Sequence, residues 1–122
     1  MTTNLDPAHL YRFAPDLLME AHNLLTLSSR FLEQTLAGEQ NDPEDLRAYL
    51  LRRAVQSDRA EIRGLFGGSS RPQAEASFRL LAHVDRAHPW LVPAGLTTPD
   101  AAAPYEELRA YVRESYDAAP WT

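Results

Sequence analysis

Cysteine and lysine are absent from the 122 residues, and isoleucine occurs once, at Ile62. Without cysteine the chain can form neither a disulfide nor a thiolate metal site. All 12 basic residues are arginine. We interpret this bias as the codon usage of a GC-rich bacterial genome rather than as a functional arginine-rich region.

Long apolar runs are also absent. No stretch approaches the roughly 20 apolar residues that a membrane span needs, and the first residues lack the cationic start and apolar run of a secretion signal. The net charge is −5, and acidic residues are mixed among the arginines, which is a poor footprint for nucleic acid. We therefore expect a cytoplasmic protein with neither a membrane nor a nucleic-acid partner.

Proline is placed where helices should begin. It suits the first helical position, and a short polar residue before it can cap the free amides. Such starts occur at Pro7, Pro15, Pro43, Pro72, Pro99 and Pro104. They predict a short helix over 7–13 and main helices over 16–37, 43–66, 72–87 and 104–118.

The helix over 16–37 has the clearest apolar periodicity. At 100° per residue one face collects Leu17, Leu18, Ala21, Leu24, Leu25, Ser28, Phe31, Leu32 and Leu36. Ser28 lies at the centre of that face, and a small residue there suggests a close crossing by another helix. Gly38 follows where a left-handed C-terminal cap is expected.

The other segments also predict helices with one apolar face. In the segment 7–13 the inward residues expected are Leu10 and Phe13. In 43–66 they are Leu50, Leu51, Ala54, Val55, Ile62, Leu65 and Phe66, and Gly67-Gly68 ends that helix. In 72–87 they are Ala74, Ser77, Leu80, Leu81 and Val84, and in 104–118 they are Tyr105, Leu108, Val112 and Tyr116. Short early loops favour antiparallel neighbours. We predict an all-α fold: one domain over 1–122, a compact antiparallel bundle of four main helices plus a short N-terminal helix.

The segment 88–103 interrupts the helical pattern. It is longer than a typical helix–helix connection, and such loops are usually functional or mobile. It carries Trp90, Leu91, Val92 and Leu96. These side chains either tuck under the bundle as a lid on the core or form a docking surface, because tryptophan is enriched at binding hot spots. Together with Trp121 they are the predicted interaction residues.

Asp58 is the most unusual polar residue, because it falls at the middle of the apolar stripe of its helix. An unpaired carboxylate is costly in a core. We expect Asp58 to be buried and satisfied by an arginine, a tyrosine or a backbone donor. The alternative is that the stripe faces a polar pocket in which Asp58 binds a ligand or acts in acid–base chemistry.

The histidines raise a second alternative, since bundles build metal sites from facing helices. His22, His83 and His88 could share a pocket with Asp58, but His83 and His88 are five apart and do not share a helix face. The run from Leu81 to Val84 resembles one helix of the DinB-type metalloproteins, which use three histidines; the resemblance covers only these residues and lacks the second half of the spacing. His88 also ends a helix, where a protonated imidazole interacts well with terminal carbonyls. We expect no metal and no cofactor.

No catalytic motif of high specificity is present in the sequence. The sequence therefore favours a small bacterial protein that acts without catalysis, by binding another protein or a second copy of itself. The alternative is a helical-bundle enzyme or a metal or small-molecule binder that uses Asp58 and the histidines.

Overall fold

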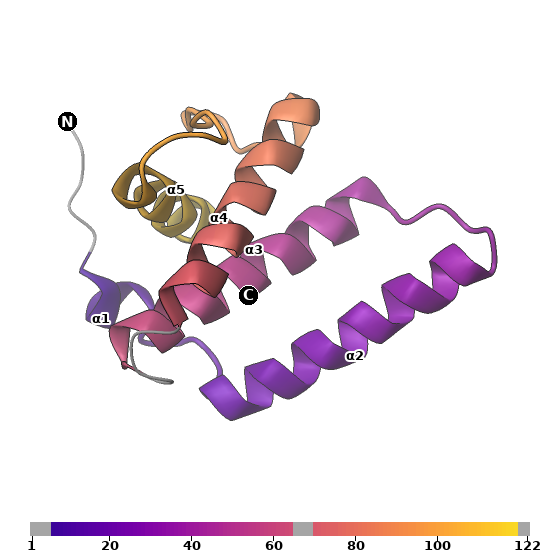
Figure 1. Ribbon diagram of the computed structural model, residues 1–122, viewed down its shortest axis with the longest axis horizontal. Helices are drawn as coiled ribbons and strands as arrows, with labels where there is room; N and C mark the ends of the chain where they lie inside the picture. The colour runs from indigo at the N-terminus through magenta and orange to yellow at the C-terminus, as the bar shows by residue number, and fades with distance from the viewer. Residues whose placement is uncertain (1–5, 65–69, 120–122) are drawn as a thin grey trace.

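The computed structural model describes residues 6–64 and 70–119, and all regular structure in these ranges is helical (Figure 1). The elements are α1 (Pro7–Leu10), α2 (Leu17–Leu36), α3 (Pro43–Ile62), α4 (Ser70–Ala87), the 3₁₀ turn η2 (Pro89–Leu91) and α5 (Tyr105–Ala118). The predicted fold class is confirmed: four main helices pack against one another, with a short N-terminal helix beside them.

The helix starts follow the proline and aspartate pattern. The side chains of Asp6, Asp16 and Asp42 accept hydrogen bonds from free amides at the starts of α1, α2 and α3. Pro7 and Pro43 occupy the first turns of α1 and α3, and Pro104 immediately precedes α5. Of the proline starts, the one at Pro99 begins no helix. Pro99 is buried in the connection before α5 instead.

Two glycines end the long helices. Gly38 (φ 78°) follows α2, as predicted, and the amide of Glu39 bonds back to the Gln34 carbonyl to close the last turn. The predicted end of α3 at Phe66 is wrong, because Gly64 (φ 66°) adopts the left-handed conformation just after Arg63. Leu65, Phe66 and Gly67-Gly68 lie outside the described residues. Helix α4 begins at Ser70, two residues before the predicted Pro72.

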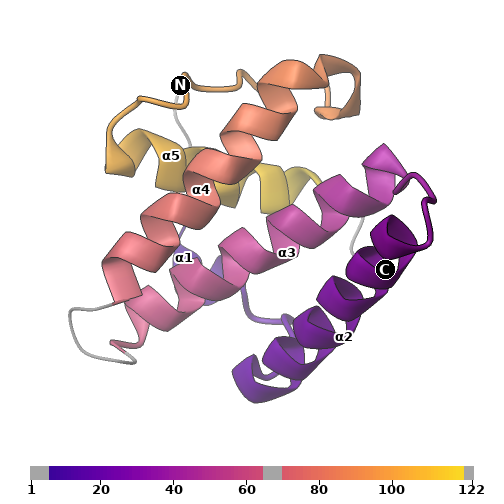
Figure 2. The same ribbon diagram turned by 45° about the vertical axis from the view of Figure 1, so that its right-hand side comes forward.

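Helix α3 lies at the centre of the fold. Helices α4 and α5 pack on it from one side, and α2 runs along its other side, away from them (Figures 1 and 2). The buried core cluster consists of Tyr11, Leu50, Leu51, Ala54, Val55, Ala74, Phe78, Leu81, Ala82, Ala103, Tyr105, Leu108, Tyr111 and Val112. Among the described residues, α2 contributes none of these side chains.

Outside α2, three predicted inward residues are exposed. Phe13 is 85% exposed, because α1 ends at Leu10 and the chain turns so that Tyr11 takes the core position. In α4 the buried face is centred on Phe78 and Leu81, which turns Leu80 outward. Ile62 is exposed because it is the last residue of α3. The prediction was wrong at these positions because helical phase was estimated without knowing where each neighbour lies.

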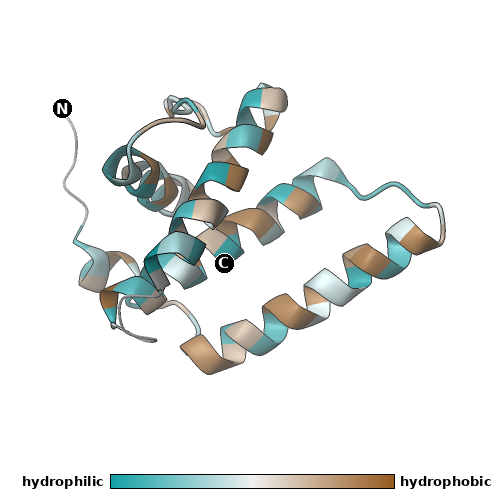
Figure 3. Ribbon diagram, viewed as in Figure 1, coloured by the Kyte–Doolittle hydropathy of each residue, from teal (hydrophilic) through white to brown (hydrophobic). Residues whose placement is uncertain are grey.

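The largest correction concerns the face of α2. Leu17 and Leu24 are buried as predicted, and Phe31 is half-buried. Leu18, Leu25, Leu32 and Leu36 are exposed, and so are Ala21 and Ser28. Among the described elements α2 packs on α3 alone, and one neighbour covers only one side of a helix. Apolar residues recur along the length of α2 (Figure 3), and four of its leucines lie outside the side that α3 covers.

Candidate functional site

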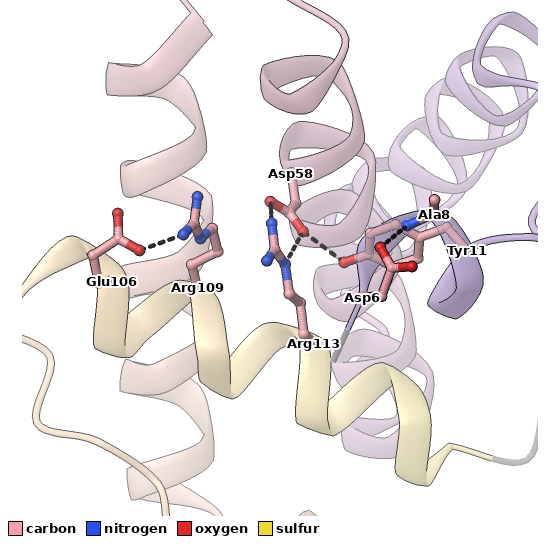
Figure 4. A network of polar contacts seen from close by, with 7 residues as sticks. All are labelled: Asp6, Ala8, Tyr11, Asp58, Glu106, Arg109 and Arg113. Carbon is pink, nitrogen blue, oxygen red and sulfur yellow. Dashed lines mark hydrogen bonds and ion pairs between the residues drawn. The ribbon is translucent and has the colours of Figure 1, made fainter. Parts of the chain in front are cut away.

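Asp58 of α3 is fully buried and has a complete set of partners (Figure 4). The guanidinium of Arg113 in α5 donates to both carboxylate oxygens, from Nε to Oδ2 at 2.9 Å and from Nη2 to Oδ1 at 3.1 Å. The hydroxyl of Tyr11, which follows α1, donates to Oδ2 at 2.7 Å. The expectation of a buried Asp58 satisfied by arginine and tyrosine is confirmed.

A second buried carboxylate, Asp85 of α4, repeats the same chemistry. Arg47 of α3 donates from Nε at 2.9 Å and from Nη2 at 3.1 Å. The hydroxyl of Tyr111 in α5 also donates to Asp85, and Thr98 lies 3.2 Å from that hydroxyl. We call these two sets the Asp58 triad (Tyr11, Asp58, Arg113) and the Asp85 triad (Arg47, Asp85, Tyr111).

The Asp85 triad was not predicted from the sequence, although a signal for it exists. Asp85 follows Phe78 by seven residues and Leu81 by four, so it lies on the same helical stripe as these fully buried residues. Arg47 and Asp58 are eleven residues apart, about three turns, so α3 presents both on one side. Two residues of α5, Tyr111 and Arg113, complete the two triads.

The electrostatics of the triads favour neutral tyrosines and charged arginines. Burial, the charge of Asp58 and the hydrogen bond to it raise the pKa of Tyr11 well above its ordinary value. Burial and the hydrogen bond to Asp85 raise the pKa of Tyr111. Burial alone would lower the pKa of Arg47, but its hydrogen bond to Asp85 and the charge of Asp85 raise it overall. Each triad therefore holds a carboxylate against a guanidinium and a protonated phenol.

This arrangement joins helices rather than presenting a reactive group. Asp58 and Asp85 have no exposed surface, and each already accepts three hydrogen bonds from its partners. The Asp58 triad ties α1 and α3 to α5, and the Asp85 triad ties α3 and α4 to α5. In this arrangement neither carboxylate is open to a substrate.

The segment 88–103 is fastened to the bundle at its end. Arg79 of α4 donates to the carbonyls of Ala101 and Ala103, and it also pairs with Glu75. Pro99 and Ala103 are buried. The segment is therefore held at its C-terminal end by contacts with α4.

The predicted interaction residues of this segment have different environments. Trp90 is 71% exposed, whereas Leu91, Val92 and Leu96 are half-buried, and Leu96 packs against the core cluster. The lid interpretation therefore does not hold for Trp90, because the 3₁₀ turn over Pro89–Leu91 leaves that ring largely exposed, in an edge-to-face contact with the ring of His88. Trp121 lies outside the described residues.

The three histidines named with Asp58 lie in other environments. His22 and His83 are exposed on α2 and α4, and His88 is half-buried, with Nδ1 3.0 Å from the Val84 carbonyl near the end of α4. That contact matches the alternative in which His88 serves a helix terminus. In the part of the chain that the structure describes, no group of three histidines or acidic residues is placed to hold a metal ion.

Two shallow hollows border α2. One lies between α2 and α3, and includes Arg30, Tyr49 and Arg52. The other holds about 240 Å³ beside Glu20, Arg52, Arg59 and Tyr116, which is smaller than the usual 300–1,000 Å³ of a ligand pocket. Neither is lined by Asp58 or a histidine. Among the described helices, none has the length and apolar character required to cross a bilayer.

The attachment of α2 to α3 relies on a few polar and aromatic contacts. Arg52 donates to both oxygens of Glu20, at 3.0 Å from Nε and 2.6 Å from Nη2. Gln56 donates to the Leu17 carbonyl at 2.7 Å. Phe31 meets Tyr49 edge to face, with ring centroids 5.4 Å apart. These contacts lie on one side of α2 and leave its opposite side open.

Among the described residues, exposed apolar side chains are concentrated on α2. Of the nine large hydrophobic side chains that are exposed among the described residues, five belong to α2: Leu18, Met19, Leu25, Leu32 and Leu36. We call Leu18, Leu25, Leu32 and Leu36, with Ala21 and Ser28 between them, the leucine face. Its four leucines are 59–80% exposed. Contiguous apolar surface of this kind marks interaction sites.

Comparison with known proteins gives no family or relative: the chain matches no protein-family model, no curated protein and no solved structure.

Proposed function

We propose that this protein acts without catalysis, by binding a protein partner, either another protein or a second copy of itself, through the leucine face of α2. The observation that supports this most directly is that α2 is a 20-residue helix that adds nothing to the core cluster among the described residues, yet exposes four leucines. Helices shorter than about 12–15 residues are marginal alone, and longer ones still depend on packing of an apolar face. A partner that covers the leucine face would supply that packing.

Trp90 is a second candidate contact. Its ring is largely exposed, and tryptophan is among the residues that most often dominate binding energy. Leu91, Val92 and Leu96 would support such a contact from beneath, since they are half-buried. The arginine-only basic set and the mixed surface charge fit a bacterial cytoplasmic protein with neither a membrane nor a nucleic-acid partner.

The alternative of an enzyme or a metal or small-molecule binder has less support. It depended on Asp58 and histidines sharing a pocket. Asp58 is enclosed by Tyr11 and Arg113, while His22 and His83 face solvent. A reaction that uses these groups would first have to open the buried triad.

Photo-crosslinking in the cells from which the protein comes tests the proposal. A photoreactive amino acid replaces Leu25 in one variant and exposed Arg86 of α4 in a control. We expect the variant at position 25 to form a covalent adduct with a discrete protein, and the variant at position 86 to form none. Equal labelling at both positions, or no adduct at position 25, would contradict the proposal.

A further inference from the structure

The leucine face has the spacing of a two-helix seam. Leu18, Leu25 and Leu32 are seven residues apart, and Ala21, Ser28 and Thr35 repeat at seven with an offset of three. These are the a and d positions of a heptad, in which large and small residues occupy separate rows. A seven-residue repeat keeps one stripe directed at a partner helix along its whole length.

The row of small residues points to a close partner that the chain does not supply. Ser28 and Ala21 are exposed, and α2 packs on α3 alone among the described elements. A partner helix could approach this row closely, because no large side chain would separate the two backbones there. The leucines beside the row would then pack against the partner helix. The partner that fits must offer leucines where α2 offers small residues.

We propose that this partner is α2 of a second copy of the chain, packed antiparallel about a two-fold axis near the helix midpoint. This rests on the proposed function, since it identifies the protein that the leucine face binds. A two-fold interface uses the same surface on both subunits and must be self-complementary. The face of α2 meets this condition in both size and charge.

Size complementarity favours the antiparallel orientation. In that orientation each a position opposes a d position, so Leu25 meets Ser28 of the second copy and Leu32 meets Ala21. At the ends, Leu18 meets Thr35 of the second copy. Every layer then pairs a large side chain with a small one, which is how well-packed cores interdigitate. In a parallel pair leucine would oppose leucine, and serine would oppose serine.

Charge complementarity favours the same occupant. The charged residues of α2, which are Glu20, Arg30 and Glu33, all lie off the leucine face, so two copies bring no like charges together. Beside the face, His22 comes next to Glu33 of the second copy, and an imidazole can donate to a carboxylate in either protonation state. Antiparallel helices also oppose their macrodipoles favourably.

Sedimentation equilibrium on the purified chain provides the first test. Wild type should sediment as a dimer that dissociates on dilution. Leu25→Glu places a carboxylate in the seam twice per dimer and should weaken association by at least about 100-fold. Ile62→Glu, at an exposed apolar residue outside the face, is the matched control and should leave the dimer intact. Circular dichroism confirms that each variant is folded.

A size exchange tests the antiparallel layers. Leu25→Ser places small against small, and Ser28→Leu places large against large, so each should weaken the dimer roughly tenfold or more. The double variant restores one large and one small residue in each layer. Its dissociation constant should return to within a few-fold of wild type. Additive weakening in the double variant would overturn the antiparallel register.

Introduced cysteines report the orientation without background, because the chain has none of its own. A mixture of Leu18→Cys and Thr35→Cys chains should form a disulfide on mild oxidation. Leu18→Cys alone should not, since the two Leu18 positions would lie about 25 Å apart along the antiparallel helices. Rapid crosslinking of Leu18→Cys with itself would overturn the proposal in favour of a parallel pair.

The outcomes separate this inference from the proposed function. A wild-type chain that stays monomeric at all concentrations overturns the second-copy inference. If photo-crosslinking at Leu25 in cells still captures a different protein, the proposed function survives. If the adduct has twice the mass of the chain and the purified protein is dimeric, both are supported. A monomer with no adduct at position 25 removes both.

Discussion

The two buried triads show how a carboxylate can lie inside an apolar core. An ion that leaves water loses several kcal/mol of solvation, and its partners recover this only when their geometry is good and the remaining lone pairs are used. Asp58 and Asp85 meet both conditions, because each has a two-point arginine contact and a tyrosine hydroxyl. The triads therefore fix how the helices are placed, and their individual residues are poorly replaceable.

Asp58→Ala should destabilise the protein by about 3–5 kcal/mol, because it leaves the guanidinium of Arg113 buried without its counter-ion. Urea unfolding measures the change. Glu106→Ala is the control, since Glu106 pairs with Arg109 in α5 at the surface (Figure 4), and exposed pairs contribute about 0–1 kcal/mol. A loss below 1 kcal/mol for Asp58→Ala would contradict the structural role of the triad.

The raised pKa values of Tyr11 and Tyr111 predict a loss of stability in alkali. Below about pH 10, both residues are protonated in the folded and unfolded chains. As pH rises further, the tyrosines ionise more readily in the unfolded chain than in the folded one, so the free energy of unfolding falls, by at most about 1.4 kcal/mol per pH unit for each residue.

Urea titrations between pH 8 and pH 11 check this sign. Wild type should show little tyrosine-dependent change up to pH 9 and a decline above pH 10. Tyr11→Phe should start from a lower free energy of unfolding, because it loses the hydrogen bond to Asp58. Its stability should also decline less steeply, because residue 11 then has no proton to lose in the unfolded chain. An equal slope in the variant would show that Tyr11 does not retain its proton in the fold.

At the scale of elements, α2 differs from the other main helices in how it is held. Its contacts with α3 include those of Glu20, Leu17 and Phe31, whereas α3, α4 and α5 share the core cluster. A helix with few buried apolar contacts opens at a lower free energy than the global unfolding. We therefore expect α2 to open at a lower free energy than the other main helices.

Hydrogen exchange should show α2 amides exchanging faster than those of α3, α4 and α5. The measurement uses Leu25→Glu, so that association adds no protection. Glu20→Ala in that background should accelerate exchange in α2 further and leave the centre of α4 unchanged, because Glu20 holds α2 through Arg52. Uniform protection across all four helices would show that α2 belongs to the cooperative core.

The 3₁₀ turn gives a prediction for Trp90. Since its ring is largely exposed, Trp90→Ala should change the free energy of unfolding by about 0.5 kcal/mol or less. Leu81→Ala, at a fully buried position, should cost about 2–5 kcal/mol in the same thermal or urea experiment. A large loss for Trp90→Ala would mean that the ring packs inward in solution.

The helix boundaries could be predicted where local chemistry decides them. Asp16, Asp42 and Gly38 act through bonds within their own turns, so the sequence near them is sufficient. The burial of Asp58 followed from its place among apolar residues. The exposure of Leu25 and the identity of the Asp85 partners could not be predicted in this way. They depend on which helix lies beside which, and a single apolar stripe is equally compatible with a core and with an interface.

For the whole molecule, the arrangement predicts stability that depends on protein concentration. If the dimer forms through α2, unfolding releases two chains, and mass action raises the midpoint with concentration. The urea midpoint of wild type should therefore rise between about 1 and 100 μM protein. Leu25→Glu should show no such rise. A concentration-independent wild-type midpoint would argue that folding and association are uncoupled.

The position of α5 in the chain has a consequence for how the protein is made. Arg113 and Tyr111 lie in the last of the described helices, and they are required by Asp58 and Asp85, which are translated much earlier. On the ribosome each carboxylate is synthesised after one of its partners, Tyr11 for Asp58 and Arg47 for Asp85, and before its partner in α5. Each triad can therefore be completed only after α5 has emerged. Burying either carboxylate before its α5 partner is present leaves it without its full set of hydrogen bonds, and this cost disfavours collapse of α3 and α4 ahead of α5.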